Sequence, residues 1–537
     1  MRRSKSLRWL VALVAAALFL GACASSSDSG SGSEGGEGED NIQPIVAGWA
    51  NPVDPTPTTG GTLNVTLPSP PSGLDPNSGT LGLATQGPIF TAIFDSLLQY
   101  DNETGEISGR LAEGITSNAD FTEWTLKLRP DVKFSDGTPL NAEAVKFSIE
   151  RIKGARNAAA SYPAYFSSIE TPDETTVVLK LDEPLNNVDA LFTTELGYVV
   201  SPTAAEAAGD EFSRNPVGAG PFKVQSFNPD SELVLVKNEN FALGDVALDE
   251  IRMTWSSDQG ANLDKVTTGQ SDMAFFSSIP LIARAVDAGL PVYSAPVAGA
   301  GFAINSAEGR PFPGNDPRIH QALSMAANPE LLNERANDGR GVAGRWLFAP
   351  GSRFYVDTPY SIGDVDKAKE LVEAVKAETG WDGSITMVTP PPEDQALAYQ
   401  AQLNAVGFNV TVDPVASFTQ LVERVLLKRD FDLSIWTLST YETNIYQVLS
   451  RSLMSSSPNN YASFSNAEFD ALLKELRAAP NDDATLEILN RIAKLWQTTQ
   501  PFFLAAQQGN SAVMRENVAG LIETSNGVFF WNEVFKA

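Results

Sequence analysis

The sequence predicts an α/β fold with a parallel or mixed sheet, and two observations support this prediction. In the second half of the chain, short strand-like runs alternate with helical runs of about 10–15 residues, a pattern typical of βαβ units. Apolar residues make up 42% of the 537 residues, which is ample for a folded core. At roughly 100–200 residues per domain, this length predicts two to four domains.

The N-terminus has the anatomy of a secretory signal. Four basic residues among the first eight precede an apolar run from Trp9 to Leu20, and small residues follow. The run is about a dozen residues, too short to cross a hydrocarbon core of roughly 30 Å. Residues 20–23 read Leu-Gly-Ala-Cys, which resembles the bacterial lipobox and implies cleavage of residues 1–22 and lipid on Cys23. Cys23 is the only cysteine, so the chain closes no disulfide within itself.

A stalk is predicted between Cys23 and the folded body. Residues 24–40 are almost entirely Ser, Gly, Glu and Asp, and residues 41–59 are rich in Pro. Such segments bury too little apolar surface to offset their conformational entropy, so we expect residues 23–58 to be a disordered, lipid-anchored stalk. The folded body is expected to begin near Gly61, where Thr62–Leu67 alternates with the period of a strand.

The charge balance excludes some partners. Residues 1–22 carry four basic residues and no acid, so their removal moves the formal charge from −28 to −32. This balance argues against binding nucleic acid or an anionic membrane through a basic patch. No later segment is apolar enough for a membrane span, so any membrane contact is expected through the Cys23 lipid alone.

Local signals predict the remaining elements in order. Asn141 is an expected N-cap for a helix through Ile152, and Asp316 and Asp364 are expected caps for two more. Gly380 is expected to end the helix that Asp364 begins. Further helices are predicted at 89–98, 393–406 and 417–428, and strands at 124–128, 176–181, 221–227, 232–237, 385–388, 408–412 and 431–438.

The sequence gives little support for catalysis. His320 is the only histidine, which excludes a multi-histidine metal site, and we expect it to be a solvated helix residue. No G-x-S-x-G elbow or phosphate-binding G-x-x-x-x-G-K-[ST] loop is present. The glycines of Gly218–Pro221 are better explained by a tight turn, and Asp482 and Asp483 by a solvated surface. We therefore predict a protein that is not an enzyme and needs no metal or cofactor.

Several stretches are similar to one known family. They are 93–98 with 111–113, 124–129 with 132–140, 215–222, 305 with 311–312 and 316–323, and 403–412 with 431–436. Together they resemble the extracellular solute-binding proteins of family 5, the peptide- and nickel-binding receptors of ABC importers. The resemblance runs from about Gly61 to the C-terminus.

The resemblance implies a bilobed, periplasmic-binding-protein-like fold of the cluster C type, with an extra domain inserted in the first lobe. Carried onto this chain, the first lobe comprises 59–88, 197–298 and 502–537, the inserted domain 89–196, and the second lobe 299–501. The ligand is expected in the crevice between the lobes, which close by a hinge motion.

The ligand class stays open at this stage. In peptide-binding members, an acid that follows a strand ending in Trp pairs with the α-ammonium of the peptide. The corresponding strand here is Phe431–Trp436, and Ser439 stands about where that acid is expected. A buried ammonium without a partner is costly, so neutral or sugar-like solutes remain alternatives to peptides. Glu442, three residues further on, is the alternative partner for an ammonium, and nickel is disfavoured because only one His exists.

The remaining ligand-binding candidates carry alternatives as well. Trp436 either stacks on a ligand or seals the sheet, and Thr437 belongs to the same segment. Tyr441 is a ligand contact or a residue of the solvent-exposed rim. Arg345 and Trp346, in a Gly/Pro-rich loop, either present a cation and an aromatic ring to the crevice or pack between the lobes.

The leading hypothesis is a lipid-anchored receptor on the outer face of the cell membrane, extracellular or periplasmic. Its expected partners are a small-molecule or oligopeptide ligand and the permease subunits of an ABC transporter, and the resemblance implies a monomer. A surface sensor or adhesion protein on the same fold, uncoupled from transport, is the first alternative. A hydrolase on a similar scaffold is the second.

Overall fold

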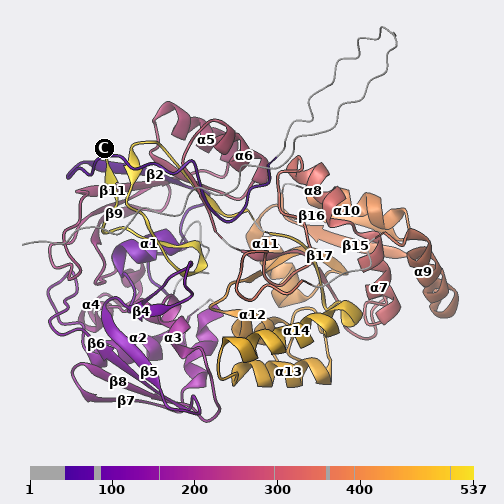
Figure 1. The fold of residues 1–537 in the computed structure, drawn as a ribbon, viewed down its shortest axis with the longest axis horizontal. Coiled ribbons are helices and arrows are strands. Elements are labelled where there is room, and N and C mark those ends of the chain that lie inside the picture. The colour runs from indigo at the N-terminus through magenta and orange to yellow at the C-terminus, as the bar shows by residue number, and fades with distance from the viewer. Residues whose placement is uncertain are drawn as a thin grey trace, which may run out of the picture. The chain divides into compact units, whose positions relative to one another are not determined.

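Two mixed β-sheets organise the part of the chain that the structure describes (Figure 1). The structure is a computed structural model and describes residues 43–77, 86–155, 158–295, 297–357, 363–391, 393–507 and 509–537. The expected signal peptide, Cys23 and the first part of the expected stalk lie outside these residues. Within them, no helix combines the length and apolar composition needed to cross a bilayer.

The first sheet has eight strands in the order β1-β13-β19-β12-β2-β11-β10-β9. They are β1 (Gly48–Ala50), β2 (Thr62–Leu67), β9 (Phe222–Asn228), β10 (Glu232–Lys237), β11 (Glu250–Trp255), β12 (Met273–Phe276), β13 (Val292–Ser294) and β19 (Ser511–Met514). Central strand β2 is parallel to both of its neighbours, β11 and β12, while the other pairs are antiparallel. Leu63, Val65 and Leu67 of β2 are buried in one cluster, as the period-2 alternation predicts.

Strand β1 corrects the expected boundary of the stalk. Gly48–Ala50 pairs with Val292–Ser294 of β13, and the Trp49 ring lies 5.4 Å from that of Tyr293. The amide of Ile45 also donates to the carbonyl of Arg340 at 2.7 Å. The folded body therefore begins before residue 58. A three-residue strand between prolines is too short to produce a periodic signal in the sequence.

One helix of the inserted domain begins at its predicted cap. The Asn141 side chain accepts from the Ala144 amide at 3.0 Å and begins α2 (Ala142–Ile152). Gly218 lies against the end of α1, because a Cβ at this position would stand 2.3 Å from the Ile93 carbonyl oxygen. The other helices here are α1 (Gln86–Ile93), α3 (Val188–Leu191), α4 (Pro202–Ala208), α5 (Gln259–Thr268) and α6 (Ile279–Asp287), with short 3₁₀ helices η1 (Ala158–Tyr165), η2 (Glu195–Gly197) and η3 (Gly209–Ser213).

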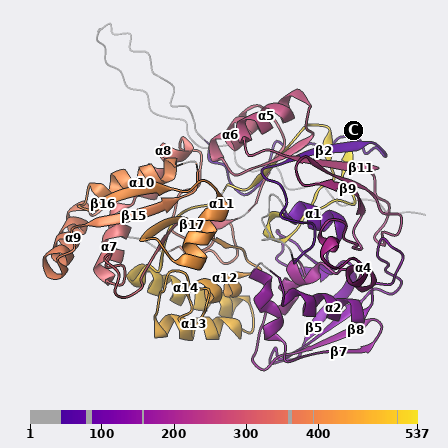
Figure 2. The same cartoon turned by 180° about the vertical axis from the view of Figure 1, so that it is seen from behind.

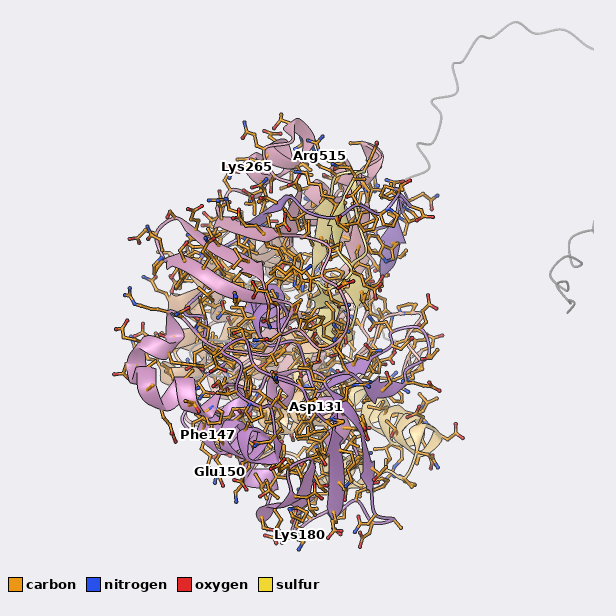
Figure 3. The ribbon with its side chains drawn as sticks, turned by 90° about the vertical axis from the view of Figure 1, so that its left-hand side faces the viewer. Asp131, Phe147, Glu150, Lys180, Lys265 and Arg515 are labelled. Carbon is orange, nitrogen blue, oxygen red and sulfur yellow. The ribbon has the colours of Figure 1, made fainter. Side chains whose placement is uncertain are left out.

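The inserted domain contains a four-stranded antiparallel sheet in the order β5-β6-β8-β7. Its strands are β5 (Ala112–Ser117), β6 (Glu123–Leu128), β7 (Ser168–Asp173) and β8 (Thr176–Lys180), and a small hairpin pairs β3 (Leu98–Tyr100) with β4 (Ile107–Gly109). Figure 3 shows Phe147 and Glu150 on α2 and Lys180 at the far end of this sheet, away from Lys265 and Arg515. Residues 89–93 were expected in this domain, but they belong to α1, which packs in the core of the first lobe.

The second sheet has five strands in the order β16-β15-β17-β14-β18. They are β14 (Ala298–Ile304), β15 (Ser384–Thr389), β16 (Asn409–Pro414), β17 (Leu433–Thr440) and β18 (Phe502–Ala506). Strand β15 is parallel to β16 and β17, and β14 is antiparallel to β17 and β18. Phe302 and Ala303 of β14 belong to different hydrophobic clusters, so both faces of the sheet are covered.

Strand β18 corrects a second boundary. Residues 502–506 were expected in the first lobe, but they pair with β14 and complete the second sheet. Phe503 stacks on Phe302 with ring centroids 4.5 Å apart, while Phe502 points into the cluster on the opposite face. This alternation holds the strand in the second lobe, and the chain crosses to the first sheet only afterwards.

The helices of the second lobe lie around this sheet (Figures 1 and 2). They are α7 (Pro317–Ala326), α8 (Pro329–Asn337), α9 (Val365–Thr379), α10 (Asp394–Asn404), α11 (Phe418–Val422), α12 (Ile445–Leu453), α13 (Ala467–Arg477) and α14 (Asp482–Thr499). Asp316 and Asp364 cap α7 and α9 as predicted, and Gly380 ends α9 in the left-handed region at φ 74°. The helix expected at 417–428 becomes π-helical after α11, in the segment η4 (Glu423–Lys428).

The C-terminal segment after β19 stays in the first lobe. It contains the short strand pairs β20 (Val518–Ala519) with β23 (Phe535–Lys536) and β21 (Ile522–Glu523) with β22 (Phe529–Phe530), and the 3₁₀ helix η5 (Ser525–Gly527). Trp531 is fully buried, and its ring nitrogen donates to the carbonyl of Pro88 in α1 at 2.9 Å. The last residues therefore close the core of the first lobe.

Candidate functional site

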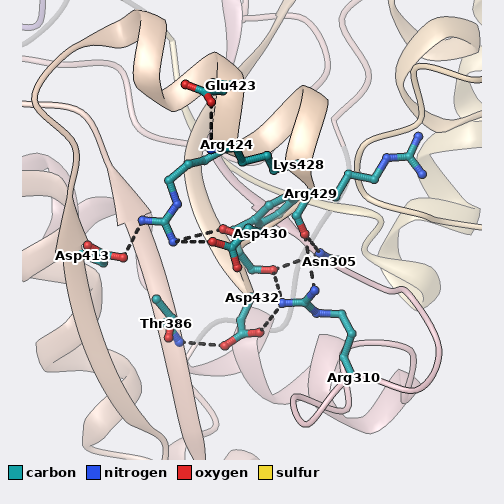
Figure 4. Close-up of polar contacts among 11 residues, drawn as sticks. Asn305, Arg310, Thr386, Asp413, Glu423, Arg424, Lys428, Arg429, Asp430 and Asp432 are labelled. Carbon is teal, nitrogen blue, oxygen red and sulfur yellow. Dashed lines mark hydrogen bonds and ion pairs between the residues drawn. The ribbon is translucent and has the colours of Figure 1, made fainter.

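Strand β17 carries several of the predicted ligand-binding residues, and a polar network fixes where it begins (Figure 4). The Asp432 carboxylate accepts from the Thr386 amide at 2.9 Å and from the Arg310 guanidinium at 3.2 Å. The Asn305 side chain donates to the Phe431 carbonyl at 2.9 Å. Arg424 of η4 pairs with Asp413 at 2.5 Å and joins this segment to β16. Hydrogen bonds and ion pairs with several other segments of the second lobe therefore fix the start of β17.

Trp436 and Thr437 lie in the middle of β17, and both side chains are half-buried. Trp436 pairs across the ladder with Gly301, and its ring lies 5.6 Å from that of Tyr461 at an angle of 56°. Thr437 pairs with Ala300 at the irregularity of the same ladder. The ring of Trp436 thus packs beside a second aromatic residue while keeping part of its surface accessible.

Ser439 occupies an unusual backbone conformation near the end of β17. Its φ of 39° lies in the left-handed region, and it stands opposite a bulge at Gly299. A Cβ at Gly299 would lie 3.2 Å from the Ser439 nitrogen, so the two strands approach closely there. The Ser439 side chain is half-buried, and its hydroxyl has no hydrogen bond among the residues described.

Tyr441 joins the second sheet to the core of the first lobe. Its side chain is only 8% exposed and belongs to the same cluster as Tyr293 and Phe529. Burial raises its pKa far above the ordinary range of tyrosine. The expectation that Tyr441 lies at a solvent-exposed rim is wrong, because apolar side chains of the other lobe cover the ring.

Glu442 is already occupied by partners from this chain. Its carboxylate accepts from the Tyr100 hydroxyl at 2.6 Å, from the Ser352 hydroxyl at 2.5 Å and from the Arg353 Nε at 2.8 Å. Arg353 also pairs with Asp482 at 2.7 Å. Glu442 therefore links β3 to the second lobe, and its charge is balanced without a ligand.

Arg345 is buried inside the second lobe. It is 3% exposed, donates to the Ser324 hydroxyl and to the carbonyls of Ser324 and Ala327, and lies 4.6 Å above the Phe503 ring. These carbonyls belong to the C-terminal end of α7, where a cation is favourable. The alternative in which Arg345 presents its charge to a crevice is wrong, because the guanidinium caps this helix.

Trp346 lines a small apolar pocket within the second lobe. The pocket is also lined by Phe348 and Phe354 of the same loop and by Leu489 and Trp496 of α14. Trp346 is half-buried. Although Trp346 directly follows Arg345 in the sequence, its side chain has apolar neighbours, whereas that of Arg345 binds carbonyls at the end of α7.

His320 is buried, so the expectation of a solvated helix residue is wrong. It is 4% exposed, its Nδ1 lies 2.9 Å from the Gln500 carbonyl, and its Nε2 lies 2.6 Å from the Gly314 carbonyl. The ring thus connects α7 with the chain that leaves α14. Within the described ranges, no group of three His, Cys, Asp or Glu side chains is placed to hold a metal ion.

The inserted domain and the second lobe meet along a continuous contact. One hydrophobic cluster contains Tyr162 and Leu196 of the inserted domain together with Tyr446 and Tyr461 of the second lobe. At its edge, the Asn187 amide exchanges hydrogen bonds of 3.0 Å with the Gln447 amide. Apolar and polar side chains of the inserted domain and the second lobe therefore both contribute to this interface.

Sequence reasoning missed two charged residues at this interface, Glu195 and Arg451. Burial raises the pKa of Glu195, while the Thr194 hydroxyl and the charge of Arg451 act to lower it. Arg451 lies on α12 and is half-buried. Neither residue belongs to a recognisable motif, and only the packing of the two domains brings their charges together.

A family model described as bacterial extracellular solute-binding proteins, family 5 Middle, matches residues 106–460. The probable D,D-dipeptide-binding periplasmic protein DdpA of Escherichia coli (strain K12) is 25% identical over 451 residues, which are 80% of this chain and 85% of that protein. Heme-binding protein A of Haemophilus influenzae is 24% identical over 473 residues, with coverage of 81% and 85%.

A solved structure has the same fold. The PBP AgaA from A. tumefaciens R10, in complex with agropinic acid, gives a TM-score of 0.75 at 23% identity and covers 89% of this chain and 99% of its own. This likeness confirms the predicted bilobed α/β fold with an inserted domain.

Proposed function

Because this chain belongs to the bacterial extracellular solute-binding proteins of family 5, we propose that it captures a small organic solute between its lobes and delivers it to an ABC permease. The observation that carries the proposal is the interface at which Tyr100 meets Glu442 and Asn187 meets Gln447. Polar groups from both sides converge there beside aromatic rings, as is typical of ligand sites between domains. A ligand bound by both sides would stabilise the closed arrangement of the lobes.

The relatives support a small organic ligand without fixing its class. Their names and titles mention a D,D-dipeptide, heme and agropinic acid. Trp436, Thr437 and Ser439 are proposed as ligand contacts, because their side chains are half-buried along β17. Trp436 packs against the hydrophobic cluster that the second lobe shares with the inserted domain. Glu442 is proposed as a positioning residue, since Arg353 and Tyr100 already engage it.

Attachment to the membrane is a separate part of the proposal. We infer that the chain is cleaved before Cys23 and anchored by lipid on that residue, at the outer face of the membrane. The support is the Leu-Gly-Ala-Cys sequence after a short apolar run. Cys23→Ser should move the mature protein from the membrane fraction to the soluble fraction. Retention of the variant in the membrane fraction would contradict the anchor.

A thermal-shift screen tests the receptor function. The chain beginning at Ala24 would be heated with single amino acids, di- to octapeptides, oligosaccharides and neutral small solutes. A ligand that binds only the folded state raises the melting temperature, by an amount that grows with its concentration. A hit should then be taken up by cells that contain the receptor and its permease, and uptake should stop when the receptor is deleted. Uptake that is unchanged by the deletion would contradict delivery to a permease.

A further inference from the structure

The N-terminal arm, residues 43–51, contacts both lobes. On the first lobe, β1 of the arm pairs with β13, and the Asn51 side chain donates to two carbonyls at and just beyond the C-terminal end of α6. On the second lobe, the Ile45 amide donates to the Arg340 carbonyl at 2.7 Å, in the loop that follows α8. The arm therefore joins the two lobes at a place outside the interface with the inserted domain.

An ion pair joins the lobes at the same place. The Arg340 guanidinium donates to the carboxylate of Asp287, the last residue of α6, through two hydrogen bonds of 2.8 and 3.0 Å. The Arg340 amide also donates to the Asn337 carbonyl at 2.8 Å, which fixes the loop to the end of α8. Figures 1 and 2 show α6 of the first lobe and α8 of the second lobe as neighbours. Arg340 thus binds the arm through its carbonyl and α6 through its side chain.

These contacts lie beside the segments through which the chain crosses between the lobes. It crosses between β13 and β14 and again between β18 and β19. The two connections meet where the Ala295 amide donates to the Asn510 carbonyl at 2.9 Å. Ile45 is 9% exposed and lines a small pocket with Asn510 and with Val342 and Gln507. The arm therefore lies against the connections that would act as the hinge between the lobes.

Rotation of the lobes must strain or break the contacts that bridge them outside these connections. A backbone hydrogen bond keeps its strength only between about 2.7 and 3.2 Å, so a small displacement of Arg340 weakens its bond with Ile45. The Ile45 side chain is buried in one cluster with Ile279 and Ile282 of α6. The arm cannot follow the second lobe without losing this burial, so it opposes movement of the Arg340 loop away from α6.

We propose that the arm is a strap across the hinge, and that it restricts rotation of the second lobe relative to the first together with the ion pair between Arg340 and Asp287. The arm is also the first described segment after the proposed anchor at Cys23, so the strap is where the anchored end of the chain meets the folded body. The strap acts on the ligand-free protein and does not depend on the proposed receptor function.

Distances between spin labels on the two lobes test the strap. The chain beginning at Ala24 lacks Cys23, the only cysteine, so cysteines introduced elsewhere are labelled selectively. Suitable sites are the exposed residues Asp264 on α5 of the first lobe and Lys369 on α9 of the second. Double electron–electron resonance on the ligand-free protein carrying Asp264→Cys and Lys369→Cys then gives the distribution of distances between the lobes.

Charge reversal tests the ion pair. Arg340→Asp and Asp287→Arg each place like charges across the contact and should broaden the distribution, changing the ratio of lobe arrangements by about 2- to 5-fold. The double variant restores opposite charges in reversed order and should return the distribution of the unaltered protein. Arg491 and Glu475 form a similar pair within the second lobe, so Arg491→Asp and Glu475→Arg are matched controls that should leave the distribution unchanged.

Removal of the arm tests its own part. A chain beginning at Asn51 lacks β1 and the Ile45 amide, and its distribution should be at least as broad as that of Arg340→Asp. Circular dichroism shows whether this chain folds. Where it does not, Ile45→Ala in the complete arm removes much of the buried contact with α6 and should broaden the distribution, whereas Val46→Ala, at a position that is 60% exposed, should not.

The outcomes separate the strap from a general loosening of the protein. An unchanged distribution after loss of the arm, or after Ile45→Ala where that variant replaces it, would overturn the strap. A charge reversal without effect, or a double variant as broad as the single ones, would remove the ion pair from it. Equal broadening in the matched controls would also contradict the proposal. Binding in the thermal-shift screen decides the receptor function separately, because the strap is measured without ligand.

Discussion

The Tyr100 hydroxyl donates a 2.6 Å hydrogen bond to the Glu442 carboxylate, joining the small β3–β4 hairpin to the end of β17. The same carboxylate holds Arg353, whose guanidinium lies 5.9 Å from the centre of the Tyr100 ring. The Tyr100 amide in turn donates to the Thr524 hydroxyl in the C-terminal segment. Three segments that are distant in sequence are therefore fastened at one point beside the proposed site.

Tyr100→Phe should reduce the free energy of unfolding by about 1–2 kcal/mol, because a hydrogen bond to a charged acceptor is lost while the ring remains. Urea unfolding followed by tryptophan fluorescence measures the change. The contact with Arg353 does not depend on the hydroxyl, so Arg353 should still hold Glu442. An unchanged urea midpoint would show that this hydrogen bond contributes nothing to the junction.

Arg345 should matter for stability and not for ligand choice. Arg345→Met keeps the length of the side chain but removes the donors that hold the Ser324 and Ala327 carbonyls. The loss of several buried hydrogen bonds should reduce the unfolding free energy by about 2–4 kcal/mol. The order of ligand affinities in a calorimetric panel should stay the same. A reordered panel would return Arg345 to the ligand-binding residues.

His320→Phe preserves the ring volume but removes both ring nitrogens from the Gln500 and Gly314 carbonyls. At least one of these buried carbonyls loses an N–H donor, so we expect a loss of about 1–3 kcal/mol in unfolding free energy. Thermal unfolding of the ligand-free protein measures it. A melting temperature equal to that of the unaltered protein would show that the two carbonyls find other donors.

The N-terminal arm is tested at Asn51. Its side chain donates to the carbonyls of Val286 and Leu290 at 2.8 and 3.1 Å, and its φ of 50° favours glycine or asparagine. Asn51→Gly removes the hydrogen bonds and raises the conformational entropy of the unfolded chain, which costs about 0.5–1 kcal/mol. Asn51→Ala removes the same hydrogen bonds and adds backbone strain of about 1–2 kcal/mol. The alanine variant should therefore be the less stable of the two in urea. Equal stability of both variants would contradict a strained, ordered arm.

The elements predicted correctly are those defined by interactions between residues that are close in sequence. Asn141, Asp316 and Asp364 each accept a hydrogen bond from an amide two or three residues ahead, so neighbouring residues suffice to define the start of each helix. Strands β1 and β18 depend instead on partners far along the chain, β13 and β14. Their placement follows from tertiary packing, which no local pattern encodes.

The residues of the candidate site show the same difference between local patterns and tertiary packing. The sequence placed Trp436 correctly on a strand, because the strand has its own apolar pattern. Ser439 was expected after the strand but lies inside β17. The sequence could not tell that Arg345 turns toward the end of α7, nor that the charge of Arg451 acts to lower the pKa of Glu195. Burial and partners of a charged side chain depend on the assembled fold, so these roles became visible only in the structure.

Asp189, on α3 at the same interface, provides a prediction about pH. Burial raises the pKa of its carboxyl from 3.8 to about 6, and the Ala190 amide, at 2.8 Å, opposes this rise. Since the folded state binds this proton more tightly than the unfolded state, stability is highest when the group is protonated. It falls as pH rises from about 4 through 6, by at most about 3 kcal/mol.

Asp189→Asn removes this ionisation while keeping an oxygen for the Ala190 amide. The variant should therefore be more stable than the unaltered protein at pH 7, and the difference should shrink toward zero at pH 4, where the carboxyl is protonated in the folded state. Urea unfolding of both proteins at several pH values between 4 and 7 measures the difference. A constant difference across this range would show that Asp189 stays ionised when folded, with Arg353, whose charge acts to lower its pKa, as the group that keeps it so.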